Sequence, residues 1–251
     1  MSVKDVTQHS RRKFIQIAGT ASASLFLAAL PGALHAQGSA PGKLRIGVIG
    51  SGNVGGTIGT LWVKAGHEVM FSSLDIEHDR KLAASIGAGA RAGTPKEAAA
   101  FGEVLFFAVP YSALPGLGRD LAAEIKGKIA LDASNPIPRR DGDMAKDALA
   151  KGAGIASSEF LPGARIVRAY NEVGAARMRD DAHRAGERLG IPLAGDDAQA
   201  LKTAVRLVQD AGHEPVVVGG LARAREFDYG TAVFGKPLTA AELRKALGLN
   251  P

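Results

Sequence analysis

Short apolar runs alternate with amphipathic segments along this 251-residue chain from about residue 43 onward. Leu44–Ile49 and Val104–Val109 are nearly all apolar, which is typical of strands that are buried on both faces. Strands that alternate with helices predict an α/β fold. The predicted strands are Leu44–Ile49, Glu68–Ser72, Ala90–Ala92, Val104–Val109, Ile129–Asp132, Ala164–Arg168, Ile191–Ala194 and His213–Val218.

Helical periodicity and capping residues fill most of the stretches between these strands. Thr94 and Thr239 are placed to cap helices, and the charged stretches 139–143 and 180–188 are predicted loops. The predicted helices are Thr57–Ala65, Asp79–Ile86, one from Thr94 through Ala100, Leu114–Leu121, one from Asp197 through Ala211, and Ala240–Leu247, with short pieces at Asp147–Ala150 and Ser157–Phe160.

A glycine-rich turn joins the first predicted strand to the first predicted helix, with the spacing G-x-G-x-x-G. Gly50 permits the tight turn, Gly52 lets the backbone approach a pyrophosphate, and Gly55 lets the helix pack closely, so that its first N–H groups face the anion. We expect a doubly wound parallel Rossmann sheet; the alternative is a glycine-rich turn in another α/β domain. The predicted pyrophosphate contacts are Gly50, Ser51, Gly52, Asn53, Val54 and Gly55.

The end of the second strand selects the nucleotide in such folds, because a carboxylate there binds the ribose hydroxyls of NAD. This chain has Ser72 and Ser73 at that place, and the possible cations His78, Arg80 and Lys81 follow. We therefore expect NADP(H), with Ser72, Ser73 and Arg80 at the adenosine phosphate. Asp75 keeps NAD as the alternative, and Arg80 and Lys81 also fit an ordinary solvated helix face.

The later strands end in residues that we expect beside the same crevice, since ligands of open parallel sheets bind at the carboxyl ends of the strands. The Asn-Pro pair at 135–136 also indicates a turn. The predicted cofactor contacts on the nicotinamide side are Ala108, Val109, Pro110 and Asn135, and the predicted substrate contacts are Tyr170 and Asn171.

The first 36 residues have the pattern of a signal peptide. Arg11 and Arg12 precede a moderately apolar run, Ile17–Leu34, and Ala36 offers a small residue for cleavage. The paired arginines resemble the twin-arginine class, which implies export of a folded protein to the periplasm by the twin-arginine machinery. Residues 37–42 would then be a linker and 43–251 the mature domain. The alternative is an uncleaved membrane anchor, which Pro31 and the polar residues in the run disfavour.

Composition excludes several kinds of site. The chain has no cysteine, so it has neither disulfides nor thiolate chemistry. Its formal net charge is +6, and the basic residues are spread along the chain, so we expect no nucleic-acid surface. Asp180, Asp181 and His183 match no metal-ligand spacing, and we expect no metal.

Five motifs in this order and spacing resemble the coenzyme F420-dependent NADP oxidoreductase family, over essentially the whole mature domain. They are Gly50–Gly55, Phe107–Tyr111, Asp132–Pro136, Val167–Asn171 and Ile191–Asp197. The resemblance implies a Rossmann domain with a small C-terminal α/β addition (about 196–251), NADPH on the glycine turn, and a deazaflavin stacked on the nicotinamide. It also implies a homodimer. The family usually has Ser-Arg after the second strand, whereas this chain has Ser73 in the place of the arginine.

Two functions from different classes fit these observations. The first is an NADPH-dependent oxidoreductase that passes hydride to a small-molecule redox acceptor, either flavin-like or a deazaflavin. Hydride transfer between stacked rings needs no protein nucleophile, so we expect no catalytic side chain. The second is a dinucleotide-binding sensor or partner-binding protein that does no chemistry. An enzyme needs an open cleft for a flat ring around Tyr170, Asn171 and Phe227–Phe234.

Overall fold

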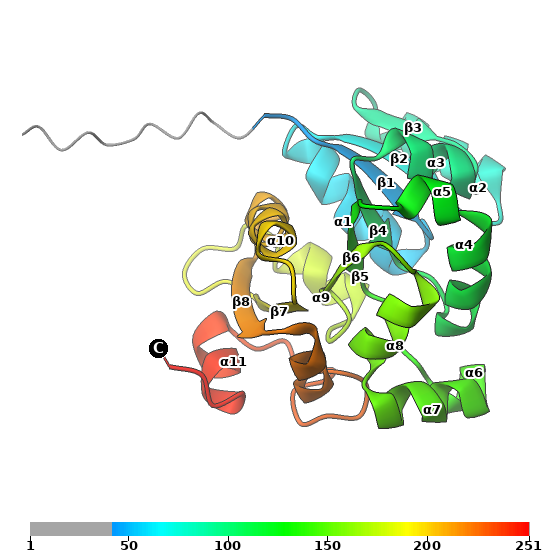
Figure 1. The fold of residues 1–251 in the computed structure, drawn as a ribbon. Helices are drawn as coiled ribbons and strands as arrows, with labels where there is room; N and C mark the ends of the chain where they lie inside the picture. Colours follow the sequence, from blue (N-terminus) through cyan, green and yellow to red (C-terminus); the bar gives the residue numbers. More distant parts are fainter. Residues whose placement is uncertain (1–41, 251) are drawn as a thin grey trace, which may run out of the picture. The chain divides into compact units, whose positions relative to one another are not determined.

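Eight strands form one sheet in residues 42–250, which are the residues that this computed structural model describes. Their order across the sheet is β3-β2-β1-β4-β5-β6-β7-β8 (Figure 1). The predicted signal peptide and all but the last residue of the predicted linker lie outside the described residues. The strands are β1 (Arg45–Ile49), β2 (Glu68–Ser72), β3 (Ala90–Ala92), β4 (Val104–Phe107), β5 (Ile129–Asp132), β6 (Arg165–Arg168), β7 (Gly190–Gly195) and β8 (Glu214–Gly219).

All neighbouring strands are parallel except β6 and β7, which pair antiparallel. The connection between these two contains the helix α9, Ala175–Asp180, which has six residues. The chain enters β7 in the reverse direction, at the edge of β6. The predicted fold class is confirmed, with this one strand as the departure from a wholly parallel sheet.

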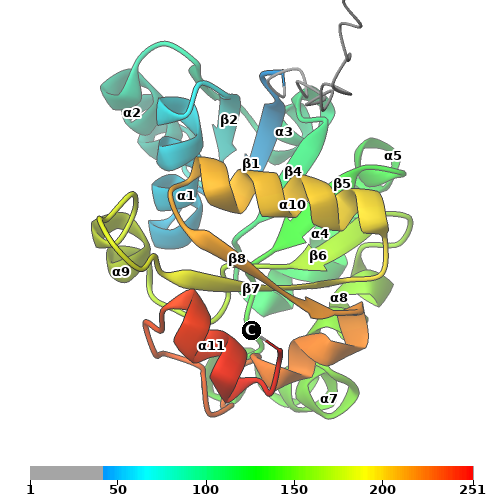
Figure 2. The same ribbon diagram turned by 90° about the vertical axis from the view of Figure 1, so that its left-hand side faces the viewer.

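Helices cover both faces of the sheet (Figures 1 and 2). The side chains of α1, α2, α9 and α10 share one apolar core with the sheet, and those of α3, α4, α5 and α8 share a second core on the opposite face. The helices are α1 (Asn53–Lys64), α2 (Ile76–Ile86), α3 (Pro95–Phe101), α4 (Leu114–Asp120), α5 (Ala122–Ile125), α6 (Pro138–Asp141), α7 (Asp143–Lys151), α8 (Ala153–Phe160), α10 (Ala198–Asp210) and α11 (Ala240–Ala246), with 3-10 turns η1 (Tyr111–Ala113) and η2 (Leu221–Glu226).

Some predicted boundaries are wrong. Helix α2 begins at Ile76, three residues before the prediction, because the Asp75 side chain caps the backbone N–H groups of Glu77 and His78. The predicted loop 139–143 contains the short helix α6, which starts at Pro138, a residue suited to the first helical position. In residues 42–250 no helix is both long and apolar enough to span a bilayer.

A buried ion cluster joins β5 and β6 to the segment after η2. The Arg168 guanidinium donates to the Asp132 carboxylate at 2.7 Å, to the Asp228 carboxylate at 3.0 Å and to the backbone oxygen of Ser134 at 2.7 Å. The Arg168 and Asp132 side chains are wholly buried and that of Asp228 is 4% exposed. Burial by itself lowers the pKa of Arg168, but the two carboxylates outweigh it and raise this pKa above its ordinary value. The guanidinium therefore stays charged in the interior.

Removing the cation should destabilise the domain strongly. We expect Arg168→Ala to lower the free energy of unfolding by about 3–5 kcal/mol, because it leaves two carboxylates buried without a positive partner. Urea denaturation measures this. The matched control is Arg165→Ala on the same strand, where the side chain is 38% exposed and pairs with Asp197 at 3.5 Å; it should cost less than about 1 kcal/mol. Equal losses in the two variants would contradict the assignment.

Candidate functional site

The turn between β1 and α1 has backbone geometry that only glycine supports at two positions. Gly50 has φ +99°, and a Cβ there would lie 2.5 Å from the backbone oxygen of Ala108. A Cβ on Gly55 would lie 1.9 Å from the oxygen of Gly50. The backbone N–H groups of Gly50 and Ser51 both donate to the oxygen of Ser72, at 2.8 and 3.0 Å. These contacts fold the turn tightly against the end of β2.

The N-terminus of α1 is open above this turn. Gly52 is its N-cap residue, and no side chain caps the first N–H groups of the helix. A Cβ on Gly52 would meet nothing within 4 Å. Helix N–H groups that are not capped by a side chain, together with the helix dipole, favour an anion. The turn and the helix thus form a site that fits a pyrophosphate.

A largely apolar cavity of about 420 Å³ adjoins the turn, between the carboxyl ends of β2 and β4. Leu74, on the loop after β2, is fully exposed at its mouth. Such a cavity suits the flat, weakly polar adenine ring. Its lining comprises Ile49, Gly50, Gly52, Ser73, Leu74, Asp75, Pro95, Ala108, Val109, Pro110, Ala113 and Leu117. Ala108, Val109 and Pro110 therefore share a cavity with the end of β2, and their predicted contact with the cofactor stays a prediction.

Two of the residues predicted at the adenosine phosphate face elsewhere. Ser72 is wholly buried, and its hydroxyl donates to the backbone oxygen of Val48 at 2.7 Å, so its predicted contact with phosphate is wrong. The Arg80 guanidinium pairs with Glu77 in the same helix and is 64% exposed. Its predicted contact with the adenosine phosphate stays a prediction.

Asp79 is a residue of this site that the sequence did not reveal. It is wholly buried, and its carboxylate accepts hydrogen bonds from the Ser51 hydroxyl and, at 3.0 Å, from the Ser73 hydroxyl. It therefore connects the glycine turn to the residue after β2. The available signal was its place in the first turn of α2, which an ordinary solvated helix explains equally well.

A second cavity, of about 330 Å³, lies along the exposed face of α1 and reaches the turn at Ser51 and Gly52. Three basic residues line it: His78 of α2, Lys64 at the end of α1 and Arg179 of α9. The ring nitrogen Nε2 of His78 lies 3.3 Å from the backbone oxygen of Ser51. His78 is therefore a basic side chain that lies against the turn.

The predicted substrate residues divide between the core and the edge of the sheet. Tyr170 is 1% exposed, and its ring packs against Trp62 and Phe106. Its predicted contact with substrate is therefore wrong for the side chain. Asn135 and Asn171 do come together, since the Asn135 amide donates to the backbone oxygen of Asn171 at 2.7 Å. Because Asn171 is also buried, the described conformation has no wide cleft at these residues.

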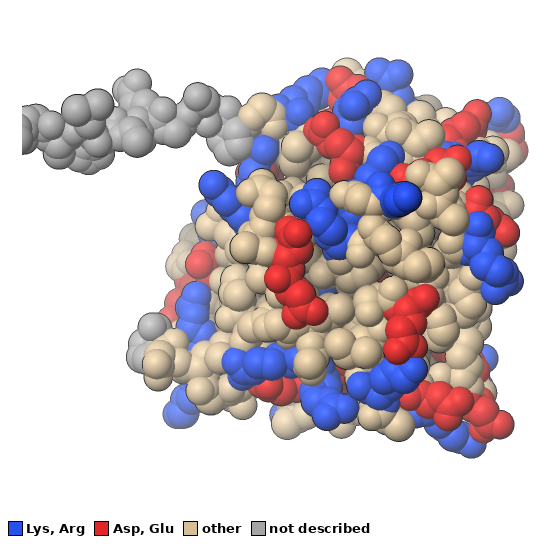
Figure 3. Space-filling model, in the orientation of Figure 1, with Lys and Arg blue, Asp and Glu red and all other residues tan. Residues whose placement is uncertain are grey.

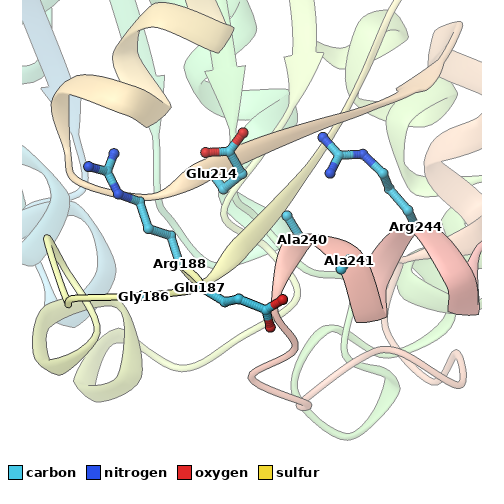
Figure 4. A pocket seen from close by; sticks show the side chains of 7 residues that line it. All are labelled: Gly186, Glu187, Arg188, Glu214, Ala240, Ala241 and Arg244. Atoms are coloured by element: carbon cyan, nitrogen blue, oxygen red, sulfur yellow. The ribbon is translucent and has the colours of Figure 1, made fainter. Parts of the chain in front are cut away.

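Other features of the described surface do not point to the chemistry. A hollow of about 300 Å³ near α11 is lined by side chains of both signs, among them Arg188, Glu214 and Arg244 (Figure 4). Basic and acidic side chains also alternate on the face shown in Figure 3. Within residues 42–250 no cluster of three or more His, Cys, Asp or Glu side chains could hold a metal ion.

Similarity to known proteins agrees with this geometry. The sequence model of a family described as NADP oxidoreductase, coenzyme F420-dependent, matches residues 45–136, from β1 to just beyond β5. Metalloreductase STEAP3 of Rattus norvegicus is 29% identical over 190 residues, which are 73% of this chain and 36% of that protein. The chain thus spans little more than a third of that relative.

Two solved structures share the fold. A hypothetical protein from Sinorhizobium meliloti superposes with a TM-score of 0.69 at 24% identity, over 79% of this chain and 96% of that one. A candidate F420-dependent NADP-reductase from Arthrobacter sp. FB24 superposes with a TM-score of 0.63 at 21% identity, over 79% of this chain and all of that one. These likenesses confirm a Rossmann-like fold, and the family model matches the part of it that contains the glycine turn.

Proposed function

We propose that this chain transfers hydride between NADP(H) and a flavin-like or deazaflavin acceptor. The observation that carries the proposal is the α1 N-terminus, whose N–H groups have no side-chain cap and open above Gly52. A Cβ atom added at Gly52 would meet no other atom within 4 Å, so the space beside this residue can accept a phosphate oxygen. The dinucleotide would supply the hydride, and the chain would supply binding and alignment.

Each end of the crevice has a distinct task in this proposal. The turn from Gly50 to Gly55 binds the pyrophosphate, and the apolar cavity beside Leu74 takes the adenine. His78 and the Ser73 hydroxyl lie on the side where a further phosphate would bind. Asn135 and Asn171, paired at the carboxyl edge of β5 and β6, lie on the side of the nicotinamide and the acceptor.

A non-catalytic dinucleotide sensor is the second candidate, and one observation favours it. Tyr170, Asn171 and Phe227 are all buried, so the described conformation does not offer a flat ring the open cleft that an enzyme needs. Under the first candidate this region must open when the acceptor binds.

Titration of the domain from residue 37 onward separates these candidates. We expect NADPH fluorescence to report saturable binding that is tighter than that of NADH, followed by NADPH oxidation when FMN, riboflavin or a deazaflavin is added. Nucleotide binding without NADPH oxidation in the presence of each of these acceptors would support the sensor. The absence of binding to either nucleotide would exclude both candidates.

Gly52→Asp tests the pyrophosphate site. We expect NADPH affinity to fall by about 100-fold or more, because a carboxylate would stand against the phosphates. Folding should be unaffected, since the new Cβ meets nothing within 4 Å. The matched control is Gly116→Asp in α4, where the nearest atom to an added Cβ is Nη2 of Arg119 at 3.9 Å. Unchanged NADPH affinity in a folded Gly52→Asp protein would overturn the site.

The contrast between His78 and Arg80 tests which basic residue serves the phosphates. We expect His78→Ala to weaken NADPH binding by about 10-fold or more, the loss of one hydrogen bond to a charged group. Arg80→Ala should leave the affinity within about twofold, because that guanidinium pairs with Glu77 on the exposed face of α2. Calorimetric titration of both variants measures the difference, and the reverse order would contradict the placement.

We also propose that residues 1–36 direct export to the periplasm through the twin-arginine route, with the dinucleotide bound before export. The conservative double substitution of Arg11 and Arg12 by lysine should retain the full-length protein in the cytoplasm, because the route depends on the arginine pair. Cell fractionation of the two proteins measures this. Equal periplasmic amounts would exclude the route.

A further inference from the structure

A carboxyl group without a hydrogen-bonding partner lies just after β6. Glu172 is 2% exposed, and neither of its carboxyl oxygens is hydrogen-bonded to another residue of the described chain; its own backbone N–H approaches it. The backbone oxygen of Glu172 accepts from the N–H of Gly235 at 2.6 Å. The segment 227–235 therefore packs against Glu172.

Burial, rather than a neighbouring charge, keeps this carboxyl protonated. Arg168 is the cation that acts on Glu172, but its guanidinium is already shared by the carboxylates of Asp132 and Asp228. A third carboxylate would add another buried negative charge to a cluster that already has two carboxylates and one guanidinium. The other titratable neighbour, Tyr170, bears a phenol that is itself buried without a partner. Burial raises the pKa of Glu172 to about 8, against only partial opposition from Arg168.

Further polar groups on the segments that meet at Arg168 and Asp228 have unused hydrogen-bonding capacity. The Ser134 hydroxyl, the Asn171 side-chain oxygen and the Thr231 hydroxyl are all buried and without partners in residues 42–250. They come from the end of β5, the end of β6 and the segment that packs on Glu172. Groups of this kind are normally satisfied in folded proteins. Such donors and acceptors are of the kind that binds a flat ring with carbonyl, N–H and ring-nitrogen atoms.

The covering segment has glycine hinges at both ends. Gly230 has φ +88° and Gly235 has φ +79°, and the residues between them include Thr231. The rings of Tyr229 and Phe234, at the two ends, lie edge to face with centroids 5.2 Å apart. Displacement of this short segment would break the hydrogen bond from Gly235 to the backbone oxygen of Glu172 and uncover this residue, while the contacts of Asp228 with Arg168 and Asn171 stay in place. Residues at such hinges absorb the backbone rotation in loop opening.

We propose that Glu172 is the acid that protonates the acceptor ring, which enters beneath the segment between Gly230 and Gly235. This inference rests on the proposed function. The nicotinamide C–H bond breaks and its hydride, with both electrons, passes to the ring. The O–H bond of Glu172 breaks and its proton passes to a ring heteroatom, and solvent reprotonates the carboxylate after the product leaves. The acceptor is then an organic ring that takes a hydride and a proton, rather than a ferric ion that takes one electron.

Glu172→Gln, which keeps the shape and removes the acid, tests the proposal with FMN and riboflavin as probes. We expect kcat to fall by about 100-fold, the usual effect of a general acid, with the NADPH dissociation constant within about twofold. The wild-type kcat should decrease as the pH rises through about 8, and the kcat of the variant should not show this decrease. The matched control is Glu226→Gln in η2, where the glutamate is 34% exposed and pairs with Arg223. This variant should keep the wild-type kcat and its decrease near pH 8.

Infrared spectroscopy gives a readout that does not depend on turnover. The wild type should show the carbonyl band of a buried protonated carboxyl group, absent from Glu172→Gln, and this band should shift when riboflavin binds to the NADP⁺-loaded protein. If the wild type turns over and Glu172→Gln has the same kcat, Glu172 is not the acid, whereas the proposed function stands. If none of the acceptors supports NADPH oxidation by the wild type, the proposed function is wrong. The infrared band then tests the role of Glu172 separately: a band that does not shift with riboflavin would show that Glu172 is not the acid either.

The stability of Glu172→Gln should depend on pH differently from that of the wild type. A carboxyl whose pKa is raised in the folded state, from 4.5 to about 8, loses stability as the pH rises between these two values. Because glutamine does not titrate, Glu172→Gln should gain in melting temperature relative to the wild type as the pH increases from 5 to 8. A variant that gains nothing over this range would show that Glu172 is not a buried acid.

Discussion

The close approach of backbone at the β1–α1 turn is the constraint from which the rest of the site follows. Gly50 lies against Ala108 at the end of β4, and Gly55 lies against Gly50 itself, so neither position has room for a Cβ atom. This approach directs the first turn of α1 over the carboxyl edge of the sheet. The helix N–H groups then face the crevice without a side-chain cap. Asp79 supports the same turn from α2 through the Ser51 and Ser73 hydroxyls.

The second half of the site depends on charge rather than on close backbone packing. Arg168 connects two strands of the main sheet with Asp228 of the C-terminal segment, across a buried region in which every charge must be paired. This pairing positions the segment 227–235 next to Asn171 and Glu172. The same guanidinium opposes only in part the burial that raises the pKa of Glu172. The stability of this region and the chemistry proposed for it thus share one guanidinium.

The nucleotide end and the acceptor end of the crevice differ in how open they are. The end beside Leu74 has an apolar cavity of about 420 Å³ and accepts a ligand without rearrangement. At the other end Tyr170 is part of the aromatic core with Trp62 and Phe106, and Asn171 is buried beneath Phe227. Binding of a dinucleotide is therefore supported by the described conformation, whereas access for an acceptor requires the segment after Asp228 to move.

The amino-acid sequence determined the strands, the glycine turn and the capping residues Thr94 and Thr239, because each depends on neighbours within a few positions. It could not place side chains whose partners are distant along the chain. Tyr170, two residues after β6, enters the core because φ +62° turns it toward Trp62 and Phe106. Arg168 pairs with Asp132 and Asp228, which are 36 and 60 residues away. Only the tertiary structure decided these contacts, since burial and charge pairing depend on which distant segments the fold brings together.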